Sequence, residues 1–302
     1  MKVFGSNVSL TGSLLWIDND LGTSFDCMES FLLENPFSVM NDWLEDLLAD
    51  GFKNKWFSET AMLGSWAEQL NCDLVIAKAE TQINQVLEAI KSSPPRAILL
   101  GGSDKMLSLT HQTDAVVIET LKVVKEALEK EIPLLGICFG AQMLLWERFK
   151  LMVNWLWTLP SGKPGCLYGS HRVDWYPESN WLSEASGMKR SFFALKLHSQ
   201  GLLLEDARDR LPPTAVLAVS KPSELAGKEV IEVVDCGARA LAISGHPEMS
   251  ARSFLAYSCS EWMAQSLQEQ GPLSEVWLRA MAYDSCRQRA DLLSLAWLKM
   301  IL

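Results

Sequence analysis

The stretch IPLLGICFGAQMLLW, residues 132–146, decides the fold of this chain. An apolar run changes to a helical pattern at Cys138, and a glycine stands two residues to either side of that cysteine. Glycine is favoured at a crowded bend because it has no side chain beyond the α-carbon. The pattern therefore predicts a sharp strand-to-helix turn that exposes the Cys138 thiol at the end of a strand. Taken alone, the same pattern also fits a buried packing cysteine.

Strand and helix patterns alternate through the first half of the chain. Short apolar runs that end in polar or glycine turns predict buried strands over residues 13–20, 72–80, 95–104 and 132–140. Apolar positions at helical spacing follow over residues 81–93 and 113–131. Because strand–helix–strand repetition produces parallel pairing, we expect a mostly parallel central sheet flanked by helices.

The second half has a different pattern. Closely spaced strands, separated by turns containing Gly, Pro or Asp, predict a smaller antiparallel sheet over residues 166–248. From residue 250 onward the spacing is helical again, and the final stretch LLSLAWLKMIL is too apolar to lie bare in water. We expect these C-terminal helices either to dock on the body of the protein or to join a second copy in a homo-oligomer. The expected fold class is α/β.

Composition and charge argue against several classes of protein. The formal net charge of −10 disfavours general binding to nucleic acid or to anionic membranes. No run of about 18 apolar residues is present that could span a bilayer. The seven cysteines are scattered without a CxxC pair, which argues against a zinc site or a disulfide framework. We therefore expect a cytoplasmic protein with reduced thiols, no nucleic-acid or membrane partner and no bound metal.

A nucleophilic cysteine needs a base, and the sequence has four histidines. His246 directly follows an apolar strand, and Glu248 comes two residues later, after Pro247. Residues two apart in an extended chain point the same way, so Glu248 can orient the His246 imidazole toward the thiol. An exposed histidine and glutamate in a loop is the plainer interpretation of this pair.

Paired glycines end another predicted strand, in ILLGGSD at residues 98–104. Such a loop brings backbone N–H groups close to a ligand with no side chain in the way. An amide from this loop, together with the amide of Phe139 after the cysteine, could form an oxyanion hole. In isolation, a plain Gly-Gly turn explains the same letters.

Together, LLGGSD (99–104), GICFGAQ (136–142) and GHPE (245–248) resemble, in order and in spacing, the motifs of class I glutamine amidotransferases. The resemblance covers about residues 13–255 and implies a flavodoxin-like fold. It also implies that Cys138 attacks the side-chain amide of L-glutamine, that His246 carries the proton and that Glu248 orients His246. The resulting thioester would be hydrolysed to glutamate without a cofactor.

The resemblance assigns further residues around the thiol. The amides of Gly102 and Phe139 would stabilise the oxyanion. The residues expected to hold glutamine are Gly101, Ser103, Gln142, Ser199 and Gln200. Gln200 stands where many members of the family have an aspartate.

Parts of the chain depart from the family pattern. We expect residues 1–255 to form the amidotransferase-like domain, with an insertion at about 21–71, and residues 256–302 to form a helical extension. A Trp-rich segment at about 146–165 replaces the usual small residues. Its tryptophans fit large core fillers better than a pocket lining or a partner surface.

The sequence is compatible with three functions. Only 54 residues follow Glu248, too few for a synthase domain, so an amidotransferase of this kind would supply ammonia to a separate synthase subunit. The same three catalytic groups also serve γ-glutamyl peptide hydrolases and acyltransferases. A non-catalytic regulatory subunit could share the fold, although a scaffold has no need for all three groups.

Overall fold

The computed structural model describes residues 2–5, 8–19, 59–103, 105–159, 161–177, 180–250, 254, 283 and 286–302. Most of the expected 21–71 insertion and most of the expected C-terminal helices lie outside these residues.

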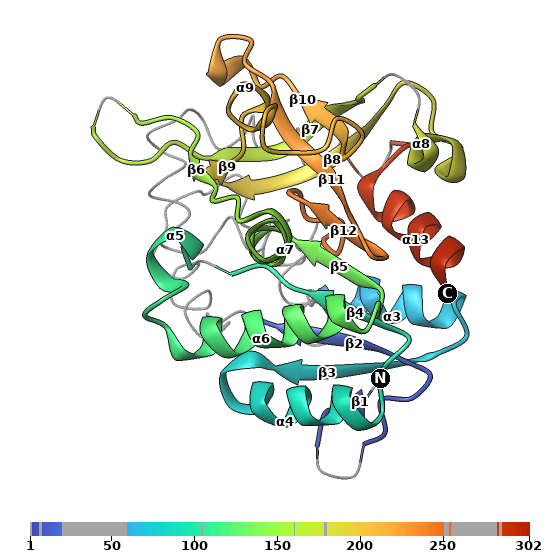
Figure 1. The fold of residues 1–302 in the computed structure, drawn as a ribbon. Helices are drawn as coiled ribbons and strands as arrows, with labels where there is room; N and C mark the ends of the chain where they lie inside the picture. Colours follow the sequence, from blue (N-terminus) through green and yellow to red (C-terminus); the bar gives the residue numbers. More distant parts are fainter. Residues whose placement is uncertain are drawn as a thin grey trace, which may run out of the picture.

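Ten of the described strands build one sheet in the order β1-β3-β2-β4-β5-β12-β11-β10-β7-β8 (Figure 1). Neighbours from β1 to β12 are parallel, and the later neighbours are antiparallel. The parallel strands are β1 (Lys2–Val3), β2 (Ser13–Asp18), β3 (Asp73–Lys78), β4 (Ala97–Leu100), β5 (Leu134–Ile137) and β12 (Ala240–Ile243). The antiparallel strands are β7 (Leu167–Trp175), β8 (Ser191–His198), β10 (Val216–Ser220) and β11 (Val230–Gly237).

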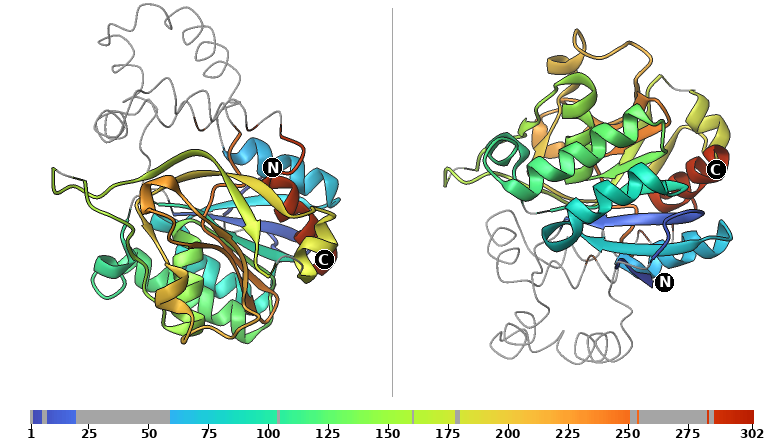
Figure 2. Two further views of the ribbon diagram at one scale, coloured as in Figure 1. Left: turned by 90° about the horizontal axis from the view of Figure 1, so that it is seen from above. Right: turned by 60° about the horizontal axis from the view of Figure 1, so that its bottom comes forward.

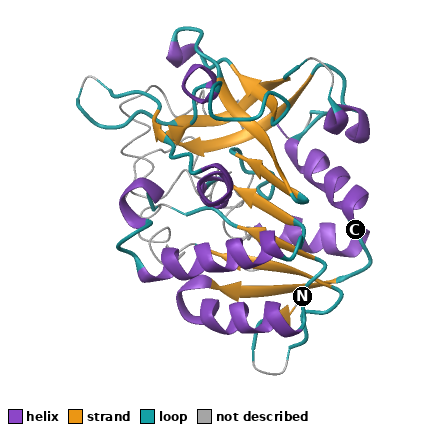
Figure 3. Cartoon of the chain, viewed as in Figure 1, coloured by secondary structure: helices purple, strands orange, loops and turns teal. Residues whose placement is uncertain are grey.

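Helices cover both faces of the parallel strands (Figures 1 and 3). One face carries α4 (Ala79–Ser92), α6 (Ala115–Glu129) and α7 (Phe139–Phe149), and the other carries α3 (Glu59–Gln69) and α13 (Ala290–Ile301). Side chains alternate along β2. Leu15 and Ile17 pack in the core under α4, α6 and α7, while Leu14 and Trp16 pack in the core under α3 and α13. None of the described helices is long and apolar enough to cross a membrane.

The expected α/β architecture is confirmed. Most of the antiparallel strands continue the main sheet, while β6 (Asn154–Trp155) and β9 (Gln200–Gly201) form a separate small antiparallel sheet. The remaining short elements are α5 (Leu107–Thr110), α8 (Trp181–Ser186), α9 (Leu204–Ala207) and the 3₁₀ turn η1 (Ser223–Leu225).

The C-terminal helix α13 docks on the body of the chain. Its Leu293, Trp297 and Leu298 are buried in the same core cluster as Trp66 of α3, and the helix contacts α8 and β8 (Figure 2). The apolar end of the sequence thus has an intramolecular partner. A homo-oligomer through the C-terminal helices stays a prediction.

Strand β8 also reaches back to the segment that follows β12. The amide of His246 donates to the carbonyl of Leu195 at 2.8 Å, and the His198 ring lies 3.0 Å from the carbonyl of Ser244. The antiparallel half of the sheet therefore bends over the carboxyl end of β12. This bend brings the end of β8 to the edge where β4, β5 and β12 end.

Candidate active site

Cys138 lies on a strained turn between β5 and α7. Its backbone angles, φ 51° and ψ −107°, are ones that residues with a side chain rarely adopt, and such a conformation costs about 1–3 kcal/mol. The backbone around this turn leaves no room for a side chain at Gly136 or Gly140. A Cβ on Gly140 would lie 2.4 Å from the carbonyl oxygen of Leu100, and one on Gly136 would lie 2.6 Å from that of Gly140. The two glycines therefore allow the sharp turn that the sequence predicts.

His246 and Glu248 form a buried pair just beyond β12. Nδ1 of His246 lies 2.8 Å from Oε1 of Glu248, and the two residues are only 5% and 1% exposed. Burial alone would lower the pKa of His246, but the charges of Glu248 and of the neighbouring Cys138 outweigh burial and hold this pKa well above its ordinary value. The site thus favours a protonated imidazole when the thiol loses its proton.

Gly102 shows that the thiol and the imidazole are neighbours. A Cβ placed on Gly102 would lie 3.2 Å from Cε1 of His246 and 3.6 Å from Cβ of Cys138. These residues follow β4, β12 and β5, which are parallel, so their carboxyl ends meet at one edge of the sheet. The structure therefore brings Cys138 together with His246 and Glu248, which lie more than 100 residues further along the chain.

Two residues beside Cys138 have backbone amides that could serve the site. Phe139 begins α7, and the first N–H groups of a helix have no partner within the helix. A Cβ on Gly102 would be in contact range of the Cys138 side chain, so the Gly102 backbone lies near it. The carbonyl of Gly101 makes structural contacts. It accepts hydrogen bonds from the amide of Gly140 at 3.1 Å and from the side chain of Asn19 at 3.1 Å. Gly101 thus ties the turn after β4 to the first turn of α7, and it is not among the residues that line the adjoining cavity.

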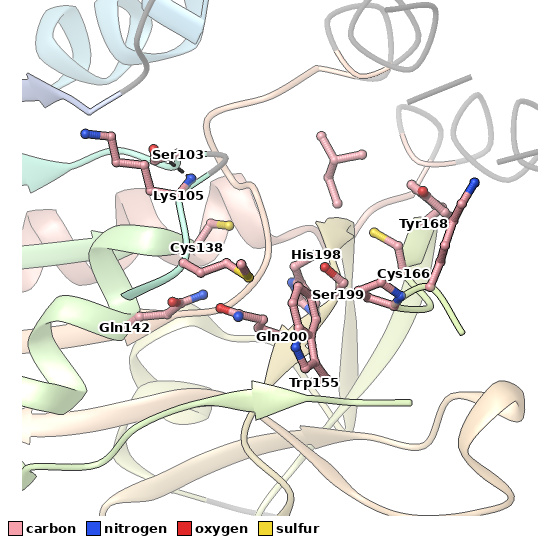
Figure 4. Close-up of a pocket in the computed structure, with 14 residues that line it drawn as sticks. Ser103, Lys105, Cys138, Gln142, Trp155, Cys166, Tyr168, His198, Ser199 and Gln200 are labelled. Carbon is pink, nitrogen blue, oxygen red and sulfur yellow. Dashed lines mark hydrogen bonds between the residues drawn. The ribbon is translucent and has the colours of Figure 1, made fainter. Parts of the chain in front are cut away.

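A cavity of about 380 Å³ opens onto Cys138 (Figure 4). Four residues that the sequence predicts as substrate contacts line it, namely Ser103, Gln142, Ser199 and Gln200. The pairing of β6 with β9 places Trp155 opposite Gln200, so that the Trp-rich segment contributes to the cavity wall. Trp155 is 43% exposed, which corrects the expectation that it is a core filler.

Several residues that line the cavity are not predicted from the sequence. They are Lys105, Met106, Lys163, Pro164, Cys166, Tyr168, Leu197 and His198. The motif HSQG pointed to Ser199 and Gln200, and His198 is the first letter of that motif. Lys105 and Met106 follow the Gly-Gly turn after β4, whereas the remaining residues lie in or beside the antiparallel strands β7 and β8.

A second buried ionic cluster joins three strands of the antiparallel half of the sheet. Lys196 of β8 contacts Glu232 of β11 and lies 2.6 Å from the hydroxyl of Ser220 in β10. Lys196 and Glu232 are 0% and 2% exposed. Burial lowers the pKa of Lys196, and the nearby carboxylate of Glu232 opposes this effect.

Comparison with known proteins agrees with the fold and the motifs. Residues 58–256 match the family model described as glutamine amidotransferase class-I, which covers more than half of the chain. The chain therefore belongs to the class I glutamine amidotransferase family.

Solved structures share the fold at low sequence identity. A glutamine amidotransferase from Thermotoga maritima superposes with a TM-score of 0.57 at 15% identity, over 96% of this chain and 97% of that chain. A glutamine amidotransferase from Methylobacillus flagellatus gives a TM-score of 0.54 at 13% identity, over 95% and 92% of the two chains. The sequence has no significant match among curated proteins.

Proposed function

We propose that this protein hydrolyses the side-chain amide of L-glutamine, with Cys138 as the nucleophile, His246 as the base and Glu248 as the group that orients the base. One observation carries this proposal. A Cβ added to Gly102 would be within contact range of both the Cys138 side chain and the His246 ring, so these two side chains flank one point, and Nδ1 of the ring is held by Glu248 at 2.8 Å. A thiol, an imidazole and a carboxylate in this order are the groups that acyl transfer requires.

The reaction follows from these positions. Sγ of Cys138 attacks the amide carbon while the thiol proton passes to Nε2 of His246, and the raised pKa of His246 favours the imidazolium that forms. The amides of Gly102 and Phe139 would stabilise the oxyanion. His246 then returns the proton to the leaving nitrogen, and ammonia departs as the thioester forms.

Water completes the cycle. His246 takes a proton from the water that attacks the thioester, and collapse of the second tetrahedral intermediate releases glutamate and restores the thiol. Ser103, Gln142, Ser199 and Gln200 line the cavity and are the proposed contacts of the glutamyl group. Gly101 would act on the site indirectly, by holding the start of α7.

We further propose that the ammonia is used by a separate synthase subunit, as is common in this family. The test is a glutamine-dependent amination that appears when a candidate synthase is mixed with this protein and is absent with the Cys138→Ala variant. Product formation that is the same with wild type and Cys138→Ala would contradict this role.

The shape of the cavity favours a second candidate substrate class. Trp155, Met106 and Leu197 add an apolar wall to the cavity, and such a wall suits a γ-glutamyl compound that carries a further group on its amide nitrogen. A kcat/KM for a γ-glutamyl peptide that greatly exceeds the value for free glutamine would favour this candidate and replace the first.

Ammonia release from L-glutamine tests the proposed function. We expect wild type to be active, and the Cys138→Ala and His246→Ala variants to lose activity while keeping the wild-type circular dichroism spectrum. Cys72→Ala is the matched control, because Cys72 is a partly exposed free cysteine outside the cavity. Normal turnover by a pure Cys138→Ala protein would refute the assignment.

A further inference from the structure

His198 lines the cavity and has a buried ring nitrogen whose hydrogen-bonding capacity is unused among the described residues. Its side chain lines the cavity beside Cys138 and the residue is 6% exposed (Figure 4). Nδ1 lies 3.0 Å from the carbonyl oxygen of Ser244, which can only accept, so the ring proton is on Nδ1. Nε2 is buried and has no hydrogen-bond partner among the described residues. A neutral ring with its proton on Nδ1 offers a lone pair at Nε2.

The surroundings keep the His198 ring neutral. Burial is the main cause that holds its pKa well below the ordinary value, and the nearby positive charge of Lys196 adds to it. His246 and His171 act in the same direction, while the hydrogen bond to Ser244 opposes them. Nε2 therefore remains an acceptor at neutral pH.

Gln142 supplies a second unused acceptor in the same cavity. Its side chain is 9% exposed, and Oε1 is buried without a hydrogen-bond partner among the described residues. Buried polar atoms are nearly always paired, and a ligand that brings N–H donors would satisfy both of these acceptors. None of the described residues that line the cavity is Asp or Glu. A cationic group bound here must therefore be held by neutral acceptors.

Glutamine has two groups with N–H donors. The amide nitrogen must lie beside His246, because it receives a proton there as it leaves. The α-ammonium group is the remaining donor, and it carries three N–H bonds that need acceptors away from the reacting carbon.

We propose that Nε2 of His198 accepts a hydrogen bond from the α-ammonium group of the substrate, with Oε1 of Gln142 as the second acceptor. This inference rests on the proposed function, since it requires an α-amino acid as the substrate. It makes His198 a specificity-determining residue that selects substrates with a free α-amino group. His198 takes no part in proton transfer at the thiol.

The first test compares two ligands on one protein. In a Cys138→Ala protein, which cannot turn over, calorimetry measures the binding of L-glutamine and of glutaramate, which is glutamine without its α-amino group. Hydrogen bonds to charged groups are strong, so we expect glutamine to bind about 10- to 100-fold more tightly than glutaramate. Equal affinities for L-glutamine and glutaramate would overturn the proposal. This test needs no substitution at His198.

The second test removes the acceptor. In His198→Asn the amide N–H can still donate to the Ser244 carbonyl, but no acceptor remains at the position of Nε2. We expect this variant to bind glutamine about 10- to 100-fold more weakly and glutaramate within about twofold of the parent. His198→Gln is the matched variant, because its longer side chain can place an amide oxygen near the Nε2 position and should restore part of the affinity. Weakening of both ligands to the same extent would overturn the proposal.

Turnover separates this inference from the proposed function. In proteins that retain Cys138, we expect His198→Asn to raise KM for glutamine with little change in kcat. Ligand discrimination that depends on His198, without any glutamine hydrolysis by wild type, would support the binding role and refute the hydrolase. Hydrolysis with discrimination unchanged by His198→Asn would refute the binding role and leave the hydrolase standing. No binding and no hydrolysis of glutamine would refute both.

Discussion

Nδ1 of His246 and Oε1 of Glu248 lie 2.8 Å apart, and both side chains are buried. A carboxylate in this position fixes the proton on Nδ1 and leaves Nε2 free to act as a base. Glu248 is thereby a positioning residue, because it acts on the thiol only through His246.

Glu248→Gln tests this relationship. The amide N–H₂ of glutamine can donate to Nδ1, which would force the ring proton onto Nε2 and block its use as a base. We expect kcat for glutamine hydrolysis to fall by about 10²- to 10⁴-fold, with a small change in KM. Ammonia release measures both constants, and thermal unfolding checks the fold. A kcat within threefold of wild type would show that Glu248 does not orient the base.

The tight packing of α7 against β4 gives a second prediction. In Gly140→Ala the new Cβ would lie 2.4 Å from the carbonyl oxygen of Leu100, which is backbone and cannot move aside cheaply. We expect a loss of about 1–3 kcal/mol in the free energy of unfolding and a large loss of activity.

Gly64→Ala is the matched control for this variant. Gly64 lies inside α3, and a Cβ there would meet nothing within 4 Å. We expect this change to stabilise the protein by up to about 1 kcal/mol and to leave activity unchanged. Equal effects of the two substitutions in urea unfolding would contradict the packing that we describe at the turn.

The buried pair Lys196–Glu232 gives a third prediction. Lys196→Met leaves the Glu232 carboxylate buried without its partner, and such a loss costs about 3–5 kcal/mol. In the double variant, Lys196→Met with Glu232→Met, no charge remains, and we expect stability within about 1 kcal/mol of wild type. Urea unfolding of both variants measures the difference. A single variant as stable as wild type would show that the pair is not coupled.

The pH dependence of stability reports on His198. Its folded pKa is depressed, so the unfolded chain takes up a proton below about pH 6.5 that the folded protein refuses. Below that pH, the free energy of unfolding of wild type should fall by about 1.4 kcal/mol per pH unit relative to that of His198→Asn. Above that pH, the stability curves of the two proteins should run parallel. His246 does not affect this comparison, because both proteins retain it, and its raised pKa makes stability fall only as the pH rises through and above the unfolded value. Parallel stability curves from pH 5 to pH 8 would contradict the neutral state of His198.

The parts of the site that local patterns encode could be predicted from the sequence. The turn at Cys138 was predictable because a short apolar run with Gly136 and Gly140 allows few other backbones. The His246–Glu248 contact was predicted from the alternation of an extended chain, but these residues form a turn in which the amide of Met249 donates to the carbonyl of His246 at 3.3 Å.

The parts that depend on distant contacts could not be predicted. His198 enters the site only because β8 bends over the end of β12, and that bend depends on backbone contacts such as His246 to Leu195. The same is true of Trp155, whose place is set by the two-residue pairing of β6 with β9. Local sequence patterns do not show which residues of the antiparallel strands will contact the carboxyl ends of the parallel strands.

Covalent labelling of the thiol tests the central claim most directly. A glutamine analogue that carries a diazoketone in place of the amide should alkylate Cys138 once per chain, as located by peptide mass spectrometry. Burial raises the pKa of the Cys166 and Cys236 thiols far above the ordinary value, so these should stay unmodified. We predict that L-glutamine protects Cys138 from the label and that His246→Ala slows the labelling strongly. Labelling at another cysteine, or no labelling of Cys138 by a protein that hydrolyses glutamine, would contradict the account.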